Sequence, residues 1–243
     1  ESFQEEVSKF RGNFKEDAFS IAEKSLTLEK RGAVAIIHFD QFGERANKLS
    51  TPNMLRLFEL FLEIEKDKSL GAVVILSRKP SIFIAGADIS EIQGMTAGTG
   101  TVESLMKLQA VFTYLEKLPI PSIAAINGAS MGGGTELSLA CDYRIVTDAP
   151  ETKIGLPEVL LGVLPGWGGT QRLPKLVGLE TALDMILTGK TVDGKKAKKM
   201  GLADKVCPKE FLEARAMEWA NELAKTKKKA NKSGGAHASL LSK

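Results

Sequence analysis

Short apolar runs alternate with segments of helical periodicity along most of this chain. Residues 25–30 alternate in polarity, which predicts a half-buried strand, and residues 33–39 predict a more buried strand after a turn at Gly32. Further short strands are predicted at residues 72–76, 83–88, 123–126, 143–146 and 203–206. Because segments with helical periodicity separate most of these strands, the pattern predicts crossover connections, a largely parallel sheet and an α/β fold.

The predicted helices have recognisable ends. Thr51 is the predicted N-cap of a helix that continues to Asp67, with Pro52 at its first position. Residues 101–117 predict a second helix, and later helices are predicted at 181–187, before Gly201 and at 209–225. In the last of these, the side chains predicted to face the interior are Phe211, Leu212, Ala216, Trp219 and Leu223.

Composition and charge narrow the class of protein. A chain of 243 residues with 43% hydrophobic residues is long enough for one α/β unit with a sizeable core. The formal net charge of +3 is too small to indicate nucleic-acid binding by itself. Two cysteines, Cys141 and Cys207, provide no disulfide framework and favour a reducing compartment. We expect no transmembrane segment, because no apolar run reaches spanning length, and no signal peptide at the N-terminus.

The two ends of the chain differ in composition from its middle. Residues 1–24 are polar and charged with scattered apolar residues, which predicts an N-terminal arm that is either a weak helix or flexible. Residues 226–243 are rich in Lys, Ser and Gly, which is typical of a disordered tail or linker. The sequence therefore predicts one folded domain over residues 25–225.

Candidate chemistry is concentrated between residues 123 and 172. An apolar run ends at a turn and leads through three consecutive glycines, residues 132–134, into a helical pattern that carries Glu136. A second carboxylate, Glu158, follows, and then the glycine-rich segment Pro165-Gly166-Trp167-Gly168-Gly169. A glycine-rich helix start exposes backbone N–H groups that can stabilise an anion, such as the enolate oxygen of a thioester. Two carboxyl groups beside it could activate a water molecule and deliver a proton.

Each of these features is common for structural reasons when it is taken alone. A glutamate in a first helical turn is favoured by the helix dipole, and glycine clusters usually form turns. The glycine spacing does not fit a dinucleotide or phosphate-binding loop. His38 lies in a core strand pattern and His237 in the tail, and neither has partners that suggest a metal site or a catalytic triad.

The ordered combination of motifs resembles the crotonase (enoyl-CoA hydratase/isomerase) superfamily. The resemblance covers about residues 25–225, and the matching segments are 83–89, 125–128, 132–137, 141–144, 155–159 and 161–166. It implies a crotonase-like fold, in which ββα units form a spiral that is followed by C-terminal helices.

The resemblance also implies a role for individual residues. Ala87 and Gly133 match the two positions whose backbone N–H groups form the oxyanion hole of the family. Glu136 and Glu158 match its pair of catalytic carboxylates, with Glu158 as the proton donor.

Substrate contacts are implied in the same way. Ala85, Asp88 and Ile89 lie in the segment that contacts coenzyme A, and Gly166 lines the catalytic end of the pocket. Trp167 replaces a small residue that is common in stand-alone hydratases. That change is equally compatible with an altered acyl pocket and with simple packing.

The implied reaction is the addition of water to a trans-2-enoyl-CoA, as in fatty-acid β-oxidation. The same carboxylates could also move a proton between C2 and C4, which is Δ3-Δ2 isomerisation. Coenzyme A is then part of the substrate, and no separate cofactor or metal is expected.

Three features are similar to multifunctional fatty-acid oxidation α chains: the loop 43–50, Ser90, and the segment 172–175. This similarity implies a hydratase/isomerase domain that acts in a complex with a thiolase β subunit or as a homo-oligomer. The expected compartment is the bacterial cytoplasm, or the mitochondrial matrix in a eukaryote.

Two other classes of function remain open. One is a different crotonase-type reaction such as thioester hydrolysis, although the presence of both glutamates argues against it. The other is RNA binding through the lysine-rich C-terminus, for which a solvated tail is the more usual explanation.

Overall fold

The larger of two sheets forms the centre of the protein. The computed structural model describes residues 16–88, 91, 99–226 and 229. The sheet has the order β1-β2-β3-β5-β7-β10 and is parallel except for the β1–β2 hairpin, which turns at Gly32. Its strands are β1 (Leu26–Arg31), β2 (Val34–Phe39), β3 (Ala72–Ser77), β5 (Ser122–Ile126), β7 (Tyr143–Thr147) and β10 (Lys205–Cys207). The predicted α/β class and largely parallel sheet are confirmed.

A second, smaller sheet has the order β4-β6-β8-β9. It consists of β4 (Ile82–Ile84), β6 (Ala129–Met131), β8 (Ile154–Gly155) and β9 (Thr191–Val192). The first three strands are parallel to one another, and β9 is antiparallel to β8. The carboxyl ends of β4, β6 and β8 therefore lie along one edge of this sheet.

Chain order links the two sheets in a repeating unit. Each of β3, β5 and β7 contributes to the large sheet and is followed by a short strand of the small sheet and then by a helix. The helices are α5 (Thr99–Lys117), α6 (Gly133–Ala140) and, after the 3-10 helix η1 (Pro157–Leu161), α7 (Gly169–Val177). Three successive units of this kind form the ββα spiral that the sequence predicts.

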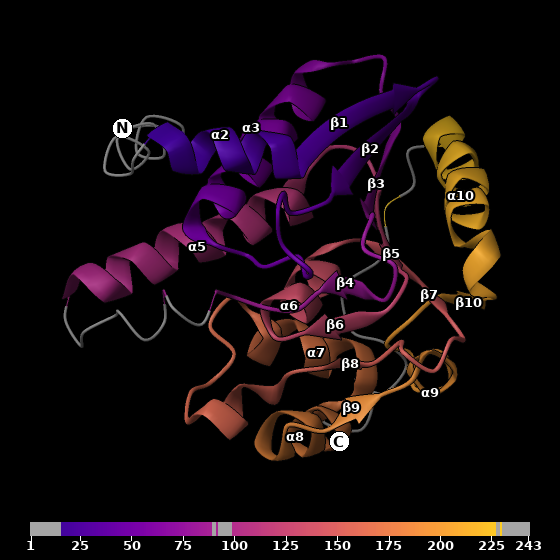
Figure 1. Cartoon of the computed structure of the whole chain (residues 1–243). Helices are drawn as coiled ribbons and strands as arrows, with labels where there is room; N and C mark the ends of the chain where they lie inside the picture. Colours follow the sequence, from indigo (N-terminus) through magenta and orange to yellow (C-terminus); the bar gives the residue numbers. More distant parts are fainter. Residues whose placement is uncertain (1–15, 89–90, 92–98, 227–228, 230–243) are drawn as a thin grey trace, which may run out of the picture.

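Helices cover both faces of the large sheet (Figure 1). On one face, α2 (Glu16–Ser25), α3 (Thr51–Lys66) and α5 pack over a main core to which Phe58, Phe61 and Phe112 contribute. On the other face lies α10 (Leu212–Thr226), which follows the 3-10 helix η2 (Lys209–Phe211). The helices α8 (Leu179–Thr188) and α9 (Gly194–Lys199) complete the C-terminal part.

Two helix starts refine the sequence predictions. The N-cap of α3 is Ser50, whose side chain accepts a hydrogen bond from the backbone N–H of Asn53, so the prediction of Thr51 was wrong by one residue. The predicted N-terminal arm, residues 1–24, contains most of the helix α2, which ends at Ser25 and buries Phe19 and Ala22. The first fifteen residues of the arm and the tail beyond residue 229 lie outside the described residues.

The docking of α10 on the sheet is mainly apolar. Trp219, Ala216 and Leu223 are buried against the second face of the sheet, as the sequence predicts. Phe211 was also predicted to be inside, but 53% of it is exposed. The predicted helix at 209–225 began about one turn too early, because residues 209–211 form the separate 3-10 helix η2.

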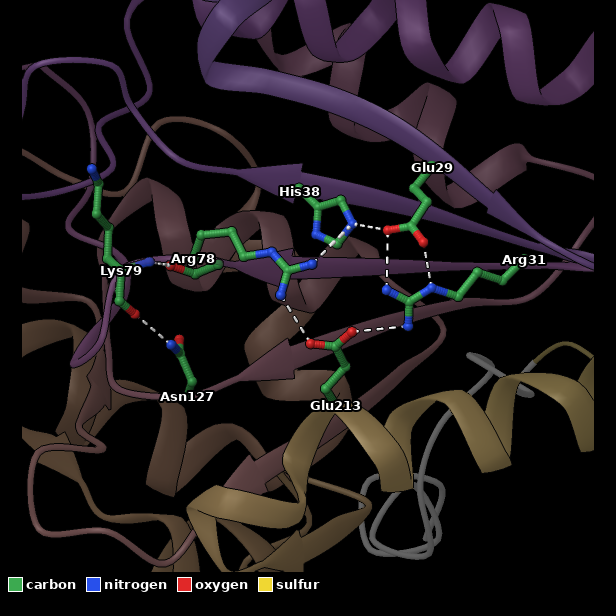
Figure 2. A network of polar contacts seen from close by, with 8 residues as sticks. Glu29, Arg31, His38, Arg78, Lys79, Asn127 and Glu213 are labelled. Atoms are coloured by element: carbon green, nitrogen blue, oxygen red, sulfur yellow. Dashed lines mark hydrogen bonds and ion pairs between the residues drawn. The ribbon is translucent and has the colours of Figure 1, made fainter.

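A charged network lies beside the first turn of α10 (Figure 2). Glu213 of this helix accepts hydrogen bonds from Arg31 of β1 and from Arg78 after β3, each at 2.9 Å. His38 of β2 joins the network through its Nε2 atom, which lies 2.7 Å from Glu29 Oε2. The side chains of Arg31, Arg78 and Glu213 are each about two-fifths exposed, and ion pairs at such solvent-accessible positions contribute about 0–1 kcal/mol each. The network therefore fixes the position of α10, while apolar burial supplies most of its stability.

The contrast between Trp219 and Phe211 provides a test of this docking. We expect Trp219→Ala to lower the free energy of unfolding by about 3–5 kcal/mol, because it leaves a large cavity under α10. We expect Phe211→Ala to change it by about 0.5 kcal/mol or less, because its ring is mostly in solvent. Urea titration followed by far-UV circular dichroism would measure both changes, and equal losses would contradict the observed orientation of the helix.

Candidate active site

The predicted site residues meet at the carboxyl edge of the small sheet. The segment 85–88 directly follows β4, Gly132 and Gly133 follow β6, and Glu158 lies three residues beyond β8. Since these three strands are parallel neighbours, their following loops lie side by side. Ligands of α/β proteins commonly bind at such an edge.

Two backbone N–H groups at this edge are available to a ligand. Leu49 bridges the segment after β4, with its N–H donating to Gly86 O at 2.8 Å and its carbonyl accepting from Asp88 N at 3.4 Å. This pairing does not use the N–H of Ala87. Gly133 is the first residue of α6, where helical N–H groups have no partner within the helix. Among the described residues, neither amide has a hydrogen-bond acceptor, so both predicted oxyanion donors can donate to a substrate oxygen.

The two segments that carry these N–H groups, one after β4 and one at the start of α6, pack tightly against each other. A methyl group on Gly86 would lie 3.2 Å from the carbonyl oxygen of Met131, at the end of β6. A methyl group on Gly134 would lie only 2.4 Å from the carbonyl oxygen of Ile84, at the end of β4. The chain after β4 therefore runs directly beside the start of α6.

The glycines at the start of α6 are needed for different reasons. Gly132 has a φ of +51°, and a methyl group there would lie 3.2 Å from Glu158 Oε1. Gly133 does not have a positive φ, but a methyl group there would lie 2.4 Å from the ring of Trp167. Gly132 therefore provides the turn and space for a carboxyl group, whereas Gly133 provides space for an indole.

Glu136 is held firmly in the interior. It lies in the first turn of α6, and its Oε1 atom accepts hydrogen bonds from the backbone N–H groups of Trp167 and Gly169, each at 2.8 Å. Burial raises the pKa of this carboxyl to about 7, the two backbone donors oppose that effect, and nearby Glu158 adds to it. Glu136 can therefore change its protonation state near neutral pH.

Glu158 is the second carboxyl of the site. It occupies the first turn of η1, where solvated glutamates are common, but its Oε2 atom is buried and has no hydrogen-bond partner among the described residues. Burial raises its pKa as well, and the hydrogen bond to its own backbone only partly opposes that effect. An unsatisfied buried carboxyl oxygen is costly in a free protein and is suited to contact with a substrate or a water molecule.

Trp167 links several parts of the site. Its ring is buried, packs against Gly133 and makes an edge-to-face contact with Phe112 of α5, with the ring centroids 5.7 Å apart. Its Nε1 atom is also buried without a hydrogen-bond partner among the described residues. Packing therefore accounts for this large side chain, and an effect on the acyl pocket stays a prediction.

The predicted coenzyme A contacts lie at the periphery. Ala85 is exposed, and its backbone N–H donates to Asn47 O at 2.8 Å. Asp88 is partly buried, 3.9 Å from Lys48 Nζ. Gly166 is exposed, with nothing within 4 Å of the position that a side chain would take. Ile89 lies outside the described residues.

Sequence reasoning missed the roles of the bend between η1 and α7. Gly168 has a φ of +102°, Gly169 donates to Glu136, and Arg172 donates to the carbonyl of Trp167 at 2.9 Å. The motif itself was recognised, but its glycine content indicated only a turn. No sequence spacing reveals that its N–H groups point toward a carboxyl about thirty residues earlier in the chain.

Two further searches of the described residues concern metals and membranes. No group of three or more His, Cys, Asp and Glu side chains in the described part of the chain is arranged to hold a metal ion. No described helix combines the length and the apolar character that are needed to cross a bilayer.

Comparison with known sequences identifies proteins that are related to this chain. The sequence profile described as "Enoyl-CoA hydratase/isomerase" matches residues 29–236. The chain is 46% identical over 208 residues to the fatty acid oxidation complex subunit alpha of Shewanella loihica, covering 85% of this chain and 30% of that protein. The corresponding protein of Idiomarina loihiensis is 46% identical over 199 residues, with 82% and 28% covered. The chain thus spans less than a third of the length of these relatives.

Solved structures show the same fold. An enoyl-CoA hydratase from Bacillus anthracis superposes with a TM-score of 0.77 at 35% identity, covering 82% of this chain and 76% of that one. An enoyl-CoA hydratase from Mycobacterium tuberculosis gives a TM-score of 0.69 at 27% identity, covering 83% and 82%. The crotonase-like architecture predicted from the sequence is confirmed.

The raised pKa of Glu136 predicts a characteristic dependence of stability on pH. A carboxyl has a pKa of about 4.3 in an unfolded chain, so between about pH 4.5 and 7 the folded state binds a proton that the unfolded state has lost. Stability therefore falls as the pH rises through this window, by roughly 3 kcal/mol for this group. We expect Glu136→Gln to be more stable than the wild type at pH 8 and to lose that advantage below about pH 4.5.

Thermal melting of both proteins at several pH values would measure this effect. The exposed Glu180, in the first turn of α8, provides a matched control as Glu180→Gln. A stability difference between Glu136→Gln and the wild type that stays constant from pH 4.5 to 8 would contradict the raised pKa.

Proposed function

The chain belongs to the enoyl-CoA hydratase/isomerase family, and on that premise we propose that it adds water to trans-2-enoyl-CoA thioesters to give 3-hydroxyacyl-CoA. One observation carries this proposal. The buried carboxyl group of Glu136 and the half-buried carboxyl group of Glu158 lie beside a glycine-lined turn that also presents the N–H of Gly133. Hydration of an activated double bond needs this combination of a base, an acid and an oxyanion donor.

The N–H groups of Ala87 and Gly133 would bind the thioester oxygen. As the water oxygen bonds to C3, the electrons of the C2=C3 double bond move toward this oxygen and form an enolate. Donors in fixed positions favour that charge most strongly in the transition state, where losing one typically costs about 10²–10³ in rate. The packing of Gly134 against Ile84 keeps the two donor segments together without relying on mobile side chains.

The carboxyl groups would complete the transfer of one water molecule. Glu136 as a carboxylate accepts a proton from the water whose oxygen bonds to C3. Glu158 as a carboxylic acid gives its proton to C2, which collapses the enolate. The proton taken from water then passes back to Glu158, so that the net change is H on C2 and OH on C3.

The raised pKa values of both carboxyl groups support proton transfer near neutral pH, while the division of roles between them follows the family resemblance. Burial raises the pKa of Glu158, which favours the protonated form that a donor requires. The pKa of about 7 for Glu136 matches a base that works near neutral pH, where it can both accept and release a proton. The two backbone hydrogen bonds to Oε1 leave the other carboxylate oxygen of Glu136 for water.

The same groups support isomerisation as a second activity. Because both carboxyl groups have raised pKa values, either can carry a proton between C4 and C2 of a 3-enoyl-CoA through the same enolate. No water is consumed in that reaction. Thioester hydrolysis is less well supported, because it does not require an acid placed to protonate carbon.

Fatty-acid oxidation is the proposed context, since the relatives named above are fatty acid oxidation complex α subunits. By this analogy, we propose that the chain is the hydratase/isomerase part of such an α chain, and that it assembles with a thiolase β subunit or with copies of itself. The proposed compartment is the cytoplasm of a bacterium or the mitochondrial matrix of a eukaryote.

An RNA-binding role receives less support from the described residues. Of the lysines near the C-terminus, Lys229 is already engaged within the chain, donating to the carbonyl oxygens of Glu116 at 2.9 Å and Leu118 at 2.6 Å. Lys227, Lys228 and Lys232 lie outside the described residues.

The central test is hydration of crotonyl-CoA, followed by the loss of its enone absorbance. We expect Glu136→Gln and Glu158→Gln each to lower kcat by about 10²–10⁴, because each removes one acid–base group. Binding of saturated butyryl-CoA should be retained within a few-fold, because neither change removes an oxyanion donor.

Glu180→Gln, a substitution of the same kind at an exposed position, should leave turnover unchanged. Wild-type turnover in a folded Glu136→Gln or Glu158→Gln variant would refute the proposed mechanism. If the wild type binds butyryl-CoA but does not hydrate crotonyl-CoA, the proposed reaction is refuted and only the proposed acyl-CoA-binding site keeps its support.

A further inference from the structure

A buried arginine lies directly behind the bend that holds Glu136. Arg172 belongs to α7 and is 9% exposed. Its Nη1 atom donates to the carbonyl oxygen of Trp167 at 2.9 Å, and its Nη2 and Nε atoms lie 3.0 and 3.3 Å from Glu116 Oε2. Hydrogen bonds that involve a charged group are roughly twice as strong as neutral ones.

The backbone of the bend is shaped around this guanidinium group. A methyl group on Gly168 would lie 2.1 Å from Arg172 Nη1, so that the guanidinium occupies the place of a side chain at that position. The φ of +102° at Gly168 is likewise unfavourable for other residues. Gly168 thus permits both the conformation of the bend and its close contact with Arg172.

The two sides of the bend have complementary partners. The N–H groups of Trp167 and Gly169 both point to Glu136 Oε1, whereas the carbonyl of Trp167 points to Arg172. Each peptide unit is planar, so fixing a carbonyl fixes the orientation of the whole unit. By holding the unit between residues 167 and 168, Arg172 restricts the rotations that would turn the two flanking N–H groups away from Glu136.

The position of Arg172 is itself fixed from α5. Glu116 lies in the last turn of that helix and binds the guanidinium from the side opposite to the bend. The backbone carbonyl of Glu116 accepts a hydrogen bond from Lys229, which also donates to Leu118 O and lies 3.5 Å from a carboxylate oxygen of Asp142. The end of α5 is thereby tied to the start of β7 and provides a rigid base for Arg172.

We propose that Arg172, oriented by Glu116, is a positioning residue that holds the 167–169 bend in the geometry that Glu136 needs to act as a base. The proposal rests on the proposed hydratase function only for the role of Glu136 as a base. The contact between bend and carboxyl exists without substrate, so its dependence on Arg172 can be measured independently of catalysis.

The charges around Glu136 give the proposal a measurable consequence. The charged groups that face it are Glu158 from η1 and Arg172 from α7, with Glu116 of α5 behind Arg172. Glu158 raises the pKa of Glu136, while the positive charge of Arg172 and the two N–H donors lower it. Loss of Arg172 removes the charge and releases the donors, and both changes raise that pKa.

The test compares Arg172→Gln, Arg172→Lys and Glu116→Gln with the wild type and with Arg215→Gln, which changes an exposed arginine of α10. The first measurement is a titration of the Glu136 carboxyl by carbon-13 NMR, assigned through its absence in Glu136→Gln. We expect its midpoint to move to higher pH in Arg172→Gln, less in Arg172→Lys and Glu116→Gln, and not at all in Arg215→Gln.

The second measurement is hydration of crotonyl-CoA as a function of pH. We expect Arg172→Gln to lower kcat by about 10-fold to 100-fold, since a displacement of about 1 Å can have that effect, while KM changes little. The acid limb of the pH profile of Arg172→Gln should move to higher pH. In Arg172→Lys, both the loss of kcat and the shift of the acid limb should be smaller, because lysine keeps the charge and one donor.

Distinct outcomes separate this proposal from the proposed function. A folded Arg172→Gln variant with an unchanged Glu136 titration overturns the positioning role, even if its turnover or melting temperature falls. If Arg172→Gln does not fold, an unchanged titration in both Arg172→Lys and Glu116→Gln overturns it equally. A wild type that does not hydrate crotonyl-CoA refutes the proposed reaction, whereas the titration still decides whether Arg172 positions Glu136.

Discussion

The structure depends on how closely the chain on either side of β6 approaches the chain at the two ends of β4. A methyl group on Gly128 would lie 2.0 Å from Ser81 O, and one on Gly134 would lie 2.4 Å from Ile84 O. These contacts are between a glycine and a backbone carbonyl, so no side-chain rearrangement could make room for a larger residue. They place β6 and α6 against β4, and the geometry of the proposed site follows from that placement because the site residues continue from the strand ends. The large sheet and its helices provide the rigid frame on which the small sheet is built.

Burial of Glu136 is the main energetic cost of this arrangement. A carboxyl group that is 2% exposed would normally be excluded from the interior, and its raised pKa measures that penalty. Two backbone N–H groups from the bend offset part of the cost, and they can do so only because Gly168 allows the bend to turn both toward one oxygen. A carboxyl group with a pKa of about 7 is thus obtained by balancing desolvation against oriented backbone dipoles, as the proposed base requires. The stability lost at neutral pH and the proposed activity have the same physical origin.

Much of the fold could be predicted from the sequence, because strand and helix periodicities are local properties. The apolar runs at 72–76 and 123–126 became β3 and β5, and the helical pattern at 181–187 became part of α8. Errors arose where local chemistry was ambiguous: Ser50 and Thr51 are both good N-caps, and Phe211 fits the helical stripe of α10 although a 3-10 turn displaces it. The proximity of the site residues came from resemblance. Spacing alone does not show that the bend at residue 167 faces α6, because that contact is set by tertiary packing.

The contacts of Trp167 show how the catalytic bend and the shape of the pocket are connected. Its backbone N–H binds Glu136 and its carbonyl binds Arg172, and any residue except proline can provide both groups. Its ring fills the space against Gly133 and Phe112, and this contribution depends on the size of the side chain. The orientation of Glu136, the proposed base, is therefore specified by main-chain atoms and glycine conformations, while the space beside Gly133 is filled by one side chain. Because these two determinants are separate, a residue of different size at position 167 would change the space beside Gly133 without removing the hydrogen bonds that hold Glu136.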